Sequence, residues 1–277
     1  MSFNEKNVVF SAPYPGTMMR ANNGIPILVE VSKVTTVAVP MTEGAIEIGA
    51  EAIKELIRSL KSMYETGKFL YDFLNIKGFI NAGQGVGNII SGIIKFIPEP
   101  ENPLVGSLRE LENEVKQLED QLSQGFDDIK SFMSELKFFV KIVSPVSVLG
   151  KLMRDCIKHP GPECVINFKE AYEERSPLNL MYSLISFLEQ KSTNPIRLAL
   201  DKGVCLTETF YSWNDIINNL LGQLLLLEAF ATGLLGTNTQ FNCEQIVEES
   251  KEVLTILEKI KNDYQIGKRV DRAQEGH

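Results

Sequence analysis

The chain has 277 residues, 44% of them hydrophobic, and a formal net charge of −8 from 36 acidic and 28 basic residues. This length and apolar content are sufficient for a large buried core, so we expect a folded protein. The basic residues are scattered singly along the chain, which argues against a nucleic-acid-binding surface and against electrostatic docking on anionic lipid. Any affinity for a membrane would therefore be mainly apolar.

Residues 1–41 differ from the rest of the chain. Their stretch GIPILVEVSKVTTVAVP is rich in β-branched residues and is bounded by Gly24, Pro26 and Pro40. This pattern predicts one or two short strands or an extended, β-like arm. The first ten residues, MSFNEKNVVF, lack the basic and apolar regions of a secretory signal. Residues 42–277 are expected to form a separate helical unit.

The helical unit begins with a predicted amphipathic helix. Thr42 is a suitable N-cap, and apolar residues recur every three or four positions from Ile46 to Tyr64, with charged residues between them. We expect this helix to extend to about Leu74.

The uncharged stretch GFINAGQGVGNIISGII, residues 78–94, follows this helix. Its alternating glycines do not match a dinucleotide-binding loop, because Asn88 stands where the third glycine is required and no β-α-β pattern surrounds it. Polar residues recur at steps of three and four, so they share one face of the predicted helix. They are Asn81, Gln84, Asn88 and Ser91.

The same spacing gives this segment an apolar face and a row of small residues. Gly83 and Gly87 are four residues apart, a spacing that allows close helix–helix contact. Residues 74–97 would span roughly 36 Å as a helix, enough to cross a bilayer core of about 30 Å. Two interpretations remain open for residues 74–97: a buried core helix and a concealed membrane-inserting helix. The apolar face consists of Phe79, Ile80, Ile89, Ile90, Ile93 and Ile94.

A heptad-like apolar pattern follows the proline-rich stretch FIPEPENP. It runs from Leu104 to Val143 in steps of three and four, with acidic residues and lysines between. This pattern predicts one continuous helix of roughly 60 Å. Shorter helices are expected at residues 146–157, 165–174 and 177–190, and from Pro195 onward.

Local signals predict where several later helices begin. Ser176 and Asn194 each precede a proline and resemble N-caps, and the sequence NCEQ at residues 242–245 resembles a capping box. Residues 216–235 are almost uncharged, which favours a central core helix, with a transmembrane helix as the alternative. Trp213 just before them is expected to be a packing residue. Together these signals predict a mainly α protein, an elongated antiparallel helical bundle with a β-like N-terminal arm.

The four cysteines permit two disulfides. The turn HPGP inside CIKHPGPEC brings Cys156 and Cys164 together, and Cys205 with Cys243 would then connect two helices. If both bonds form, the protein belongs in an oxidising, extracellular compartment. Four unpaired thiols in a reducing compartment are the alternative.

Catalytic chemistry has few candidates in this sequence. His159 is the one internal histidine, and Cys156, His159 and Cys164 do not have the spacing of a familiar zinc module. The acidic residues of the heptad region occupy positions typical of a solvated helix face. We therefore expect no enzyme activity, metal, cofactor or small-molecule substrate.

The segments ELIRSLKSMYETGKFL, GQGVGNIISGIIKFI and LRELENEVKQLEDQL occur in an order that resembles cubozoan jellyfish toxins and their animal relatives, and more distantly bacterial cytolysin A. The resemblance covers about residues 45–145. It implies a secreted pore-forming protein that oligomerises on a lipid membrane and inserts residues 74–97. The apolar face would then contact lipid, while Asn81, Gly83, Gln84, Gly87, Asn88 and Ser91 would line a pore or join subunits.

A second hypothesis belongs to a different class. The protein would be a non-lytic helical interaction or lipid-binding protein that uses its heptad pattern or its core. The apolar heptad residues would then be partly exposed in the monomer, because a heptad pattern is satisfied equally well within one chain or between chains.

Overall fold

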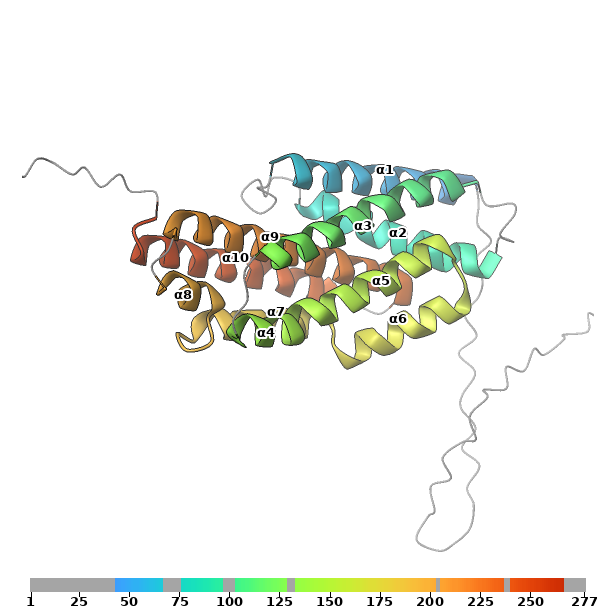
Figure 1. Ribbon diagram of the computed structural model, residues 1–277. Coiled ribbons are helices and arrows are strands. Elements are labelled where there is room, and N and C mark those ends of the chain that lie inside the picture. The colour runs from blue at the N-terminus through green and yellow to red at the C-terminus, as the bar shows by residue number, and fades with distance from the viewer. Residues whose placement is uncertain are drawn as a thin grey trace, which may run out of the picture. The chain divides into compact units, whose positions relative to one another are not determined.

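The computed structural model describes residues 43–66, 76–96, 103–128, 133–202, 205–236 and 240–266. Every regular element within these ranges is a helix (Figure 1), so the prediction of a mainly α protein is confirmed. The predicted β-like arm, residues 1–41, lies outside the described residues.

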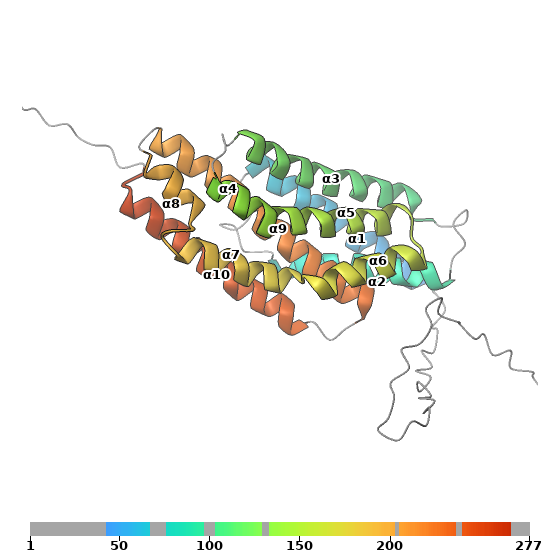
Figure 2. The same ribbon diagram turned by 60° about the horizontal axis from the view of Figure 1, so that its bottom comes forward.

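The elements follow one another along the chain as shown in Figures 1 and 2. They are α1 (Glu43–Thr66), α2 (Ile76–Phe96), α3 (Val105–Asp128), α4 (Met133–Phe138), the π-helix η3 (Phe139–Val143), α5 (Ser144–Lys158), α6 (Pro162–Glu174), α7 (Pro177–Glu189), α8 (Pro195–Leu200), α9 (Leu206–Leu235) and α10 (Gln240–Asp263).

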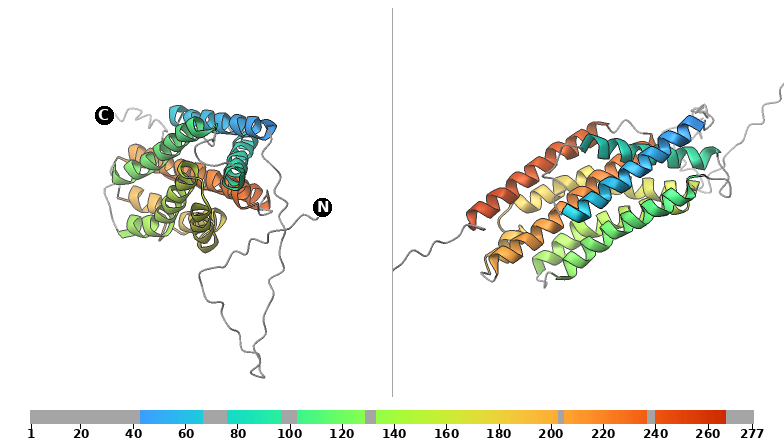
Figure 3. Two further views of the ribbon diagram at one scale, coloured as in Figure 1. Left: turned by 90° about the vertical axis from the view of Figure 1, so that its right-hand side faces the viewer. Right: turned by 90° about the horizontal axis from the view of Figure 1, so that it is seen from above.

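Helix α9 forms the centre of the helical unit. It packs against α2, α3, α5, α6, α7, α8 and α10, and the end-on view in Figure 3 shows other helices arranged around it. Among the described residues, α9 is the one helix long and apolar enough to span a membrane, but 89% of its apolar window is buried in the protein. The prediction of a core helix at residues 216–235 agrees with this placement, and Trp213 is fully buried as a packing residue.

The predicted continuous helix from Leu104 to Val143 is wrong, because α3 ends at Asp128. The rings of Phe126 and Phe138 stack with their centroids 6.1 Å apart. A straight helix would separate residues 126 and 138 by about 18 Å, so the chain must turn back between them. Glu119 of α3 also pairs with Arg154 of α5 at 3.0 Å, which requires α3 and α5 to lie side by side.

The turn divides the heptad pattern into two parts with different environments. In α3 the apolar residues face the core, whereas Leu136 and Val140, which continue the pattern, are 59% and 52% exposed. The buried members before the turn are Leu104, Leu108, Leu111, Val115, Leu118 and Leu122, and Val143 at the end of the pattern is buried as well. The heptad residues of α3 are therefore packed within the chain.

No break separates Val143 from residue 146, where the sequence predicted the end of one helix and the start of the next. Elements α4, η3 and α5 follow one another without a break, and the N–H of Ser144 bonds to the carbonyl of Phe139, five residues back. A proline inside a helix has no N–H and its ring clashes with the carbonyl four residues earlier. The wider π turn just before Pro145 accommodates this clash.

The predicted N-caps of α7 and α8 are confirmed. The Ser176 hydroxyl accepts a hydrogen bond from the N–H of Asn179, and the Asn194 side chain accepts from Ile196 and Arg197. Helix α10, in contrast, begins at Gln240 and not at the predicted capping box. Asn242 lies inside this helix and its side chain bonds to other helices.

Candidate functional site

Glycines of α2 allow its backbone to approach α9 closely. A methyl group built on Gly83 would lie 2.8 Å from Cβ of Ala229, and one on Gly87 would lie 2.3 Å from the carbonyl oxygen of Phe230. Gly233 has the same role on α9, where a methyl group would lie 2.0 Å from the carbonyl oxygen of Gln84. Gly83 and Gly87 are thus contact positions of α2 against another helix of the same chain.

Helix α2 is packed against α1 on another side through small residues as well. A methyl group on Gly85 would lie 2.6 Å from Cβ of Ala52, and one on Gly49 would lie 2.5 Å from Cδ1 of Ile89. These pairs show that α1 and α2 run antiparallel. Helix α2 is therefore held between α1 and α9, which accounts for glycines that would otherwise weaken a helix in water.

The predicted lipid-facing residues are mostly in the core. Phe79, Ile89, Ile90 and Ile93 are each no more than 6% exposed, while Ile80 and Ile94 are half-buried. The predicted polar face is more accessible: of its members, Asn81 and Asn88 are exposed, and Gln84 and Ser91 are half-buried.

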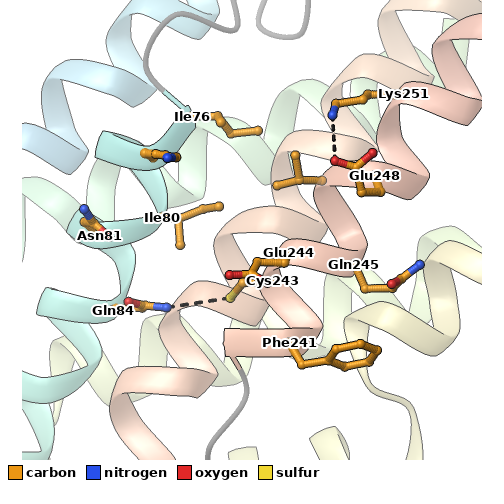
Figure 4. A pocket seen from close by; sticks show the side chains of 12 residues that line it. Ile76, Ile80, Asn81, Gln84, Phe241, Cys243, Glu244, Gln245, Glu248 and Lys251 are labelled. Atoms are coloured by element: carbon orange, nitrogen blue, oxygen red, sulfur yellow. Dashed lines mark hydrogen bonds and ion pairs between the residues drawn. The ribbon is translucent and has the colours of Figure 1, made fainter.

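An open groove of about 850 Å³ lies between the first half of α2 and the first half of α10 (Figure 4). Ile76 and Ile80 point from α2 toward α10, and Val247 contributes an apolar side chain from α10. Phe241, which also lines the groove, is 67% exposed. Polar and charged side chains complete the lining: Lys77, Asn81, Gln84, Cys243, Glu244, Gln245, Glu248 and Lys251.

The polar face of α2 therefore divides between two environments. Asn81 and Gln84 line the groove, whereas Asn88 and Ser91 lie outside it. The Gln84 amide donates to the Cys243 sulfur across 3.8 Å, a long contact that joins the two walls. Cys243 is also 3.5 Å from the hydroxyl of Thr232 on α9.

Beyond Cys243 lies a buried polar cluster centred on Glu228 of α9. The Tyr172 hydroxyl donates to Oε1 of Glu228 at 2.6 Å, and the Asn242 amide donates to the same oxygen at 3.3 Å. The other carboxyl oxygen, Oε2, has no hydrogen-bond partner among the described residues. Burial raises the pKa of Glu228 above its usual range, although the bonds from Tyr172 and Asn242 oppose this shift.

The groove carries both signs of charge at its edge. Lys251 pairs with Glu248 at 2.6 Å, within α10. Lys77 is exposed on α2 and makes no ion pair with the residues that the structure describes. Its ammonium group is consequently available to an anion at the α2 side of the groove.

All four cysteines have free thiols, so neither predicted disulfide is formed. The pairing of Cys205 with Cys243 is wrong for a geometric reason. Cys205 precedes the first residue of α9, whereas Cys243 contacts Thr232, about 40 Å further along the same helix. Cys156 and Cys164, in contrast, lie on either side of the short connection between α5 and α6, and the Cys164 thiol donates to the carbonyl of Gly161 at 2.9 Å.

The described residues show no arrangement of three His, Cys, Asp or Glu side chains suited to a metal ion. Glu228 is fully buried, and Tyr172, which donates to it, is half-buried.

The α10 side of the groove was not predicted from the sequence. Cys243 was assigned to a disulfide, and Val247 and Phe241 have no pattern that distinguishes them from core residues. Phe241 differs from a core residue in being exposed. Exposure of a side chain cannot be read from one sequence.

The DUF684 family model, described as a protein of unknown function, matches residues 106–270, more than half of the chain. The chain belongs to this family. The DUF684 match begins in α3 and includes α10, so it contains one wall of the groove but not α2. No curated protein matches the chain, and no solved structure matches it.

Proposed function

We propose that this DUF684 protein is a non-catalytic, lipid-binding helical bundle that takes a single-chain amphipathic molecule, such as a fatty acid, in the groove between α2 and α10. The observation that carries the proposal is the open volume of about 850 Å³ beside the half-buried Ile76, Ile80 and Val247. Small-molecule sites in proteins typically have about 300–1,000 Å³.

The lining favours a ligand with one apolar chain and one polar end. Ile76 and Ile80 on one wall and Val247 on the other supply apolar contacts for the chain. Lys77 and Asn81 supply donors at the α2 edge, which suits a carboxylate head group. Binding through the heptad pattern is less well supported, because those residues in α3 are already buried.

Titration with a dansyl-labelled fatty acid tests this proposal. We expect a saturable rise in fluorescence that an unlabelled fatty acid reverses. Ile80→Asp should weaken binding at least about ten-fold, since it removes an apolar contact of about 1.5 kcal/mol or more and adds a charge that repels the carboxylate. Val247→Phe should also weaken binding, because the larger ring fills the groove from the α10 side.

Asn88→Asp is the matched control, since it adds the same charge to α2 at an exposed position outside the groove. It should bind like the wild type. The proposal fails if the folded wild type shows no saturable binding, or if Ile80→Asp and Val247→Phe both bind normally. Circular dichroism melting confirms that each variant is folded.

A second candidate, pore formation by a secreted oligomer that inserts residues 74–97, is favoured by the absence of charge from Gly78 to Ile94. Calcein release from liposomes measures it. Ile90→Asp would confuse this test because Ile90 is fully buried, so the variant would also destabilise the soluble fold. Ile94→Asp, at a half-buried position, is the better variant. No release at any lipid composition by the folded protein eliminates this candidate.

A further inference from the structure

Helices α4 and α5 and the π-helix η3 between them form one continuous helical rod on the outside of the helical unit (Figure 2). The rod packs beside α3 and α6. Its buried side chains recur every three or four residues: Phe138, Ile142, Val146, Leu149, Met153 and Cys156. The exposed residues between them therefore lie on the opposite, outer side of the rod.

Exposed apolar side chains are gathered on this outer side. Leu136, Val140 and Val148 are 59%, 52% and 48% exposed, and Phe139 is 39% exposed. Val140 and Val148 also line the same shallow hollow of about 210 Å³ between α5 and α6. Single exposed apolar residues are ordinary, but a group of them on one face indicates a contact with another surface.

Four lysines are exposed on the same rod, namely Lys137, Lys141, Lys151 and Lys158. None of them makes an ion pair with the residues that the structure describes. Asp155 is the one exposed acidic residue of the rod. Although the whole chain has a net charge of −8 and its basic residues are scattered in the sequence, the outer side of this rod is basic.

Acidic residues limit this basic surface on the side of α6. Glu173 pairs with Lys169 at 3.6 Å. Glu174 pairs with Arg175 at 3.9 Å. Acidic residues further away have little effect on a contact of the rod, because the Debye length is about 8 Å at physiological ionic strength. The exposed acidic residues of α6 are Glu163, Glu170, Glu173 and Glu174.

We propose that the four exposed lysines and the four exposed apolar side chains of this rod, together called the basic face, dock the protein on an anionic lipid surface. The rod would lie parallel to the membrane, with the ammonium groups at the lipid head groups and the apolar side chains between them. From Leu136 to Lys158 the basic face is about 33 Å long, which suits an extended surface rather than a small ligand.

The type of basic residue favours lipid over an acidic protein. Lysine has a point charge on a flexible chain, so it needs no partner at a fixed position, whereas arginine binds carboxylates in a fixed planar geometry. Protein–protein interfaces are accordingly enriched in arginine and depleted of lysine. Arg154, the one arginine of the rod, bonds to Glu112 and Glu119 of α3 and does not contribute to the basic face.

Docking through the basic face does not depend on the proposed fatty-acid site. None of the eight side chains of the face lines the groove between α2 and α10. Ile80→Asp, which should weaken fatty-acid binding, should therefore leave docking unchanged, so the two proposals can fail separately.

Co-sedimentation with vesicles tests this proposal. We expect the wild type to bind vesicles of phosphatidylcholine and phosphatidylserine, mixed at roughly two to one, at least about ten-fold more tightly than pure phosphatidylcholine vesicles. Raising the ionic strength from about 0.1 M to about 1 M should weaken binding, because the Debye length falls from about 10 Å to about 3 Å. A folded wild type that does not bind the mixed vesicles, or binds both kinds equally, overturns the proposal.

Variants of the lysines test whether the basic face is responsible. Lys141→Gln with Lys151→Gln should weaken binding to the mixed vesicles about 25-fold, since each lysine near such a surface contributes about five-fold. Lys54→Gln with Lys259→Gln is the matched control, because it removes the same charge from exposed positions on α1 and α10. Equal binding by the two double variants contradicts the proposal.

The apolar side chains are tested in the same way. Leu136→Ser should weaken binding about five-fold, because a side chain that enters the lipid loses its apolar contact. Ile48→Ser on α1, where the side chain is 72% exposed, is the control and should bind like the wild type. Soluble poly-glutamate provides the last comparison: a protein that binds it through these lysines but does not bind the vesicles has an acidic protein as its partner, and the proposal is then wrong.

Discussion

Replacing Gly233 with alanine would place a methyl group inside the contact between α2 and α9. That group would lie 2.0 Å from the carbonyl oxygen of Gln84, 2.8 Å from the amide nitrogen of Asn88 and 2.9 Å from the carbonyl carbon of Gln84. All three atoms belong to the backbone of α2, so no side-chain rotation relieves the overlap. The two helices would have to separate by about 1 Å or more.

The cost can be estimated from two opposing effects. Overpacking a well-packed core costs about 1–3 kcal/mol, and the rigid backbone neighbours of Gly233 place this site near the upper end. Alanine in place of glycine within a helix returns about 1 kcal/mol. We therefore expect a net loss of about 2 kcal/mol, which lowers Tm by about 4–8 °C for a unit of this size.

Urea denaturation followed by circular dichroism measures this loss, with thermal melting as a second measure. Gly106→Ala in α3 is the matched control, because a methyl group there meets nothing within 4 Å, and it should be neutral or slightly stabilising. Gly87→Ala tests the facing side of the same contact, and the double variant should cost less than the sum, since one methyl group already separates the helices. A Gly233→Ala protein as stable as Gly106→Ala would refute the close contact between α2 and α9.

Two further predictions concern buried charges. Burial raises the pKa of Glu228 in the folded protein. The contribution of Glu228 to stability is therefore complete below about pH 4, where the carboxyl group is protonated in the folded and the unfolded protein. That contribution is lost as the pH rises through the pKa of the folded protein. Glu228→Gln should accordingly be more stable than the wild type at pH 8 and lose this advantage at pH 4, as measured by urea denaturation at both; an equal difference at both values contradicts it. Arg154 bonds to Glu112 at 3.1 Å and to the largely buried Glu119 at 3.0 Å, so Arg154→Ala should cost about 3 kcal/mol by leaving Glu119 unpaired. Adding Glu119→Gln should recover part of that loss, and a single variant within about 0.5 kcal/mol of the wild type would show that the pair is not important.

The positions of helices could be predicted where the spacing of apolar residues or a capping residue marked them. Residues Ile76 to Phe96 form a helix within the predicted range 74–97, and Ser176 and Asn194 cap helices as expected. In each case the information is local, since a stripe of apolar side chains or a single capping side chain determines the outcome.

The turn between α3 and α4 could not be predicted in the same way. The apolar steps continue from Leu122 through Phe126 to Leu136 as if one helix ran on. The spacing of apolar residues indicates which face of a helix is apolar, but it does not indicate where the chain reverses direction. The stacking of Phe126 on Phe138 is a tertiary contact, and it places both rings beside Trp213.

The groove could be predicted only in part, for a related reason. The sequence identified the polar face of α2, and two of its members, Asn81 and Gln84, line the groove. The opposite wall comes from α10, 159 residues away from Gln84 in the case of Cys243. No local sequence pattern indicates that two helices lie apart, because a groove forms where contacts between two distant segments are absent.

The packing of α2 also limits how this helix could enter a membrane. Transfer into lipid would keep its apolar side chains out of water, so the hydrophobic contribution of α2 itself would not be lost. Its neighbours are affected differently. Departure of α2 would expose the faces of α1 and α9 that now cover it, to which Ala52 and Ala229 belong. Exposing a large buried apolar side chain costs about 1.5–3 kcal/mol, so exposing several of them together is comparable with the whole stability of a domain. Release of α2 alone is therefore unfavourable, and a membrane-active form would also have to bury the exposed faces of α1 and α9 in lipid or against another subunit.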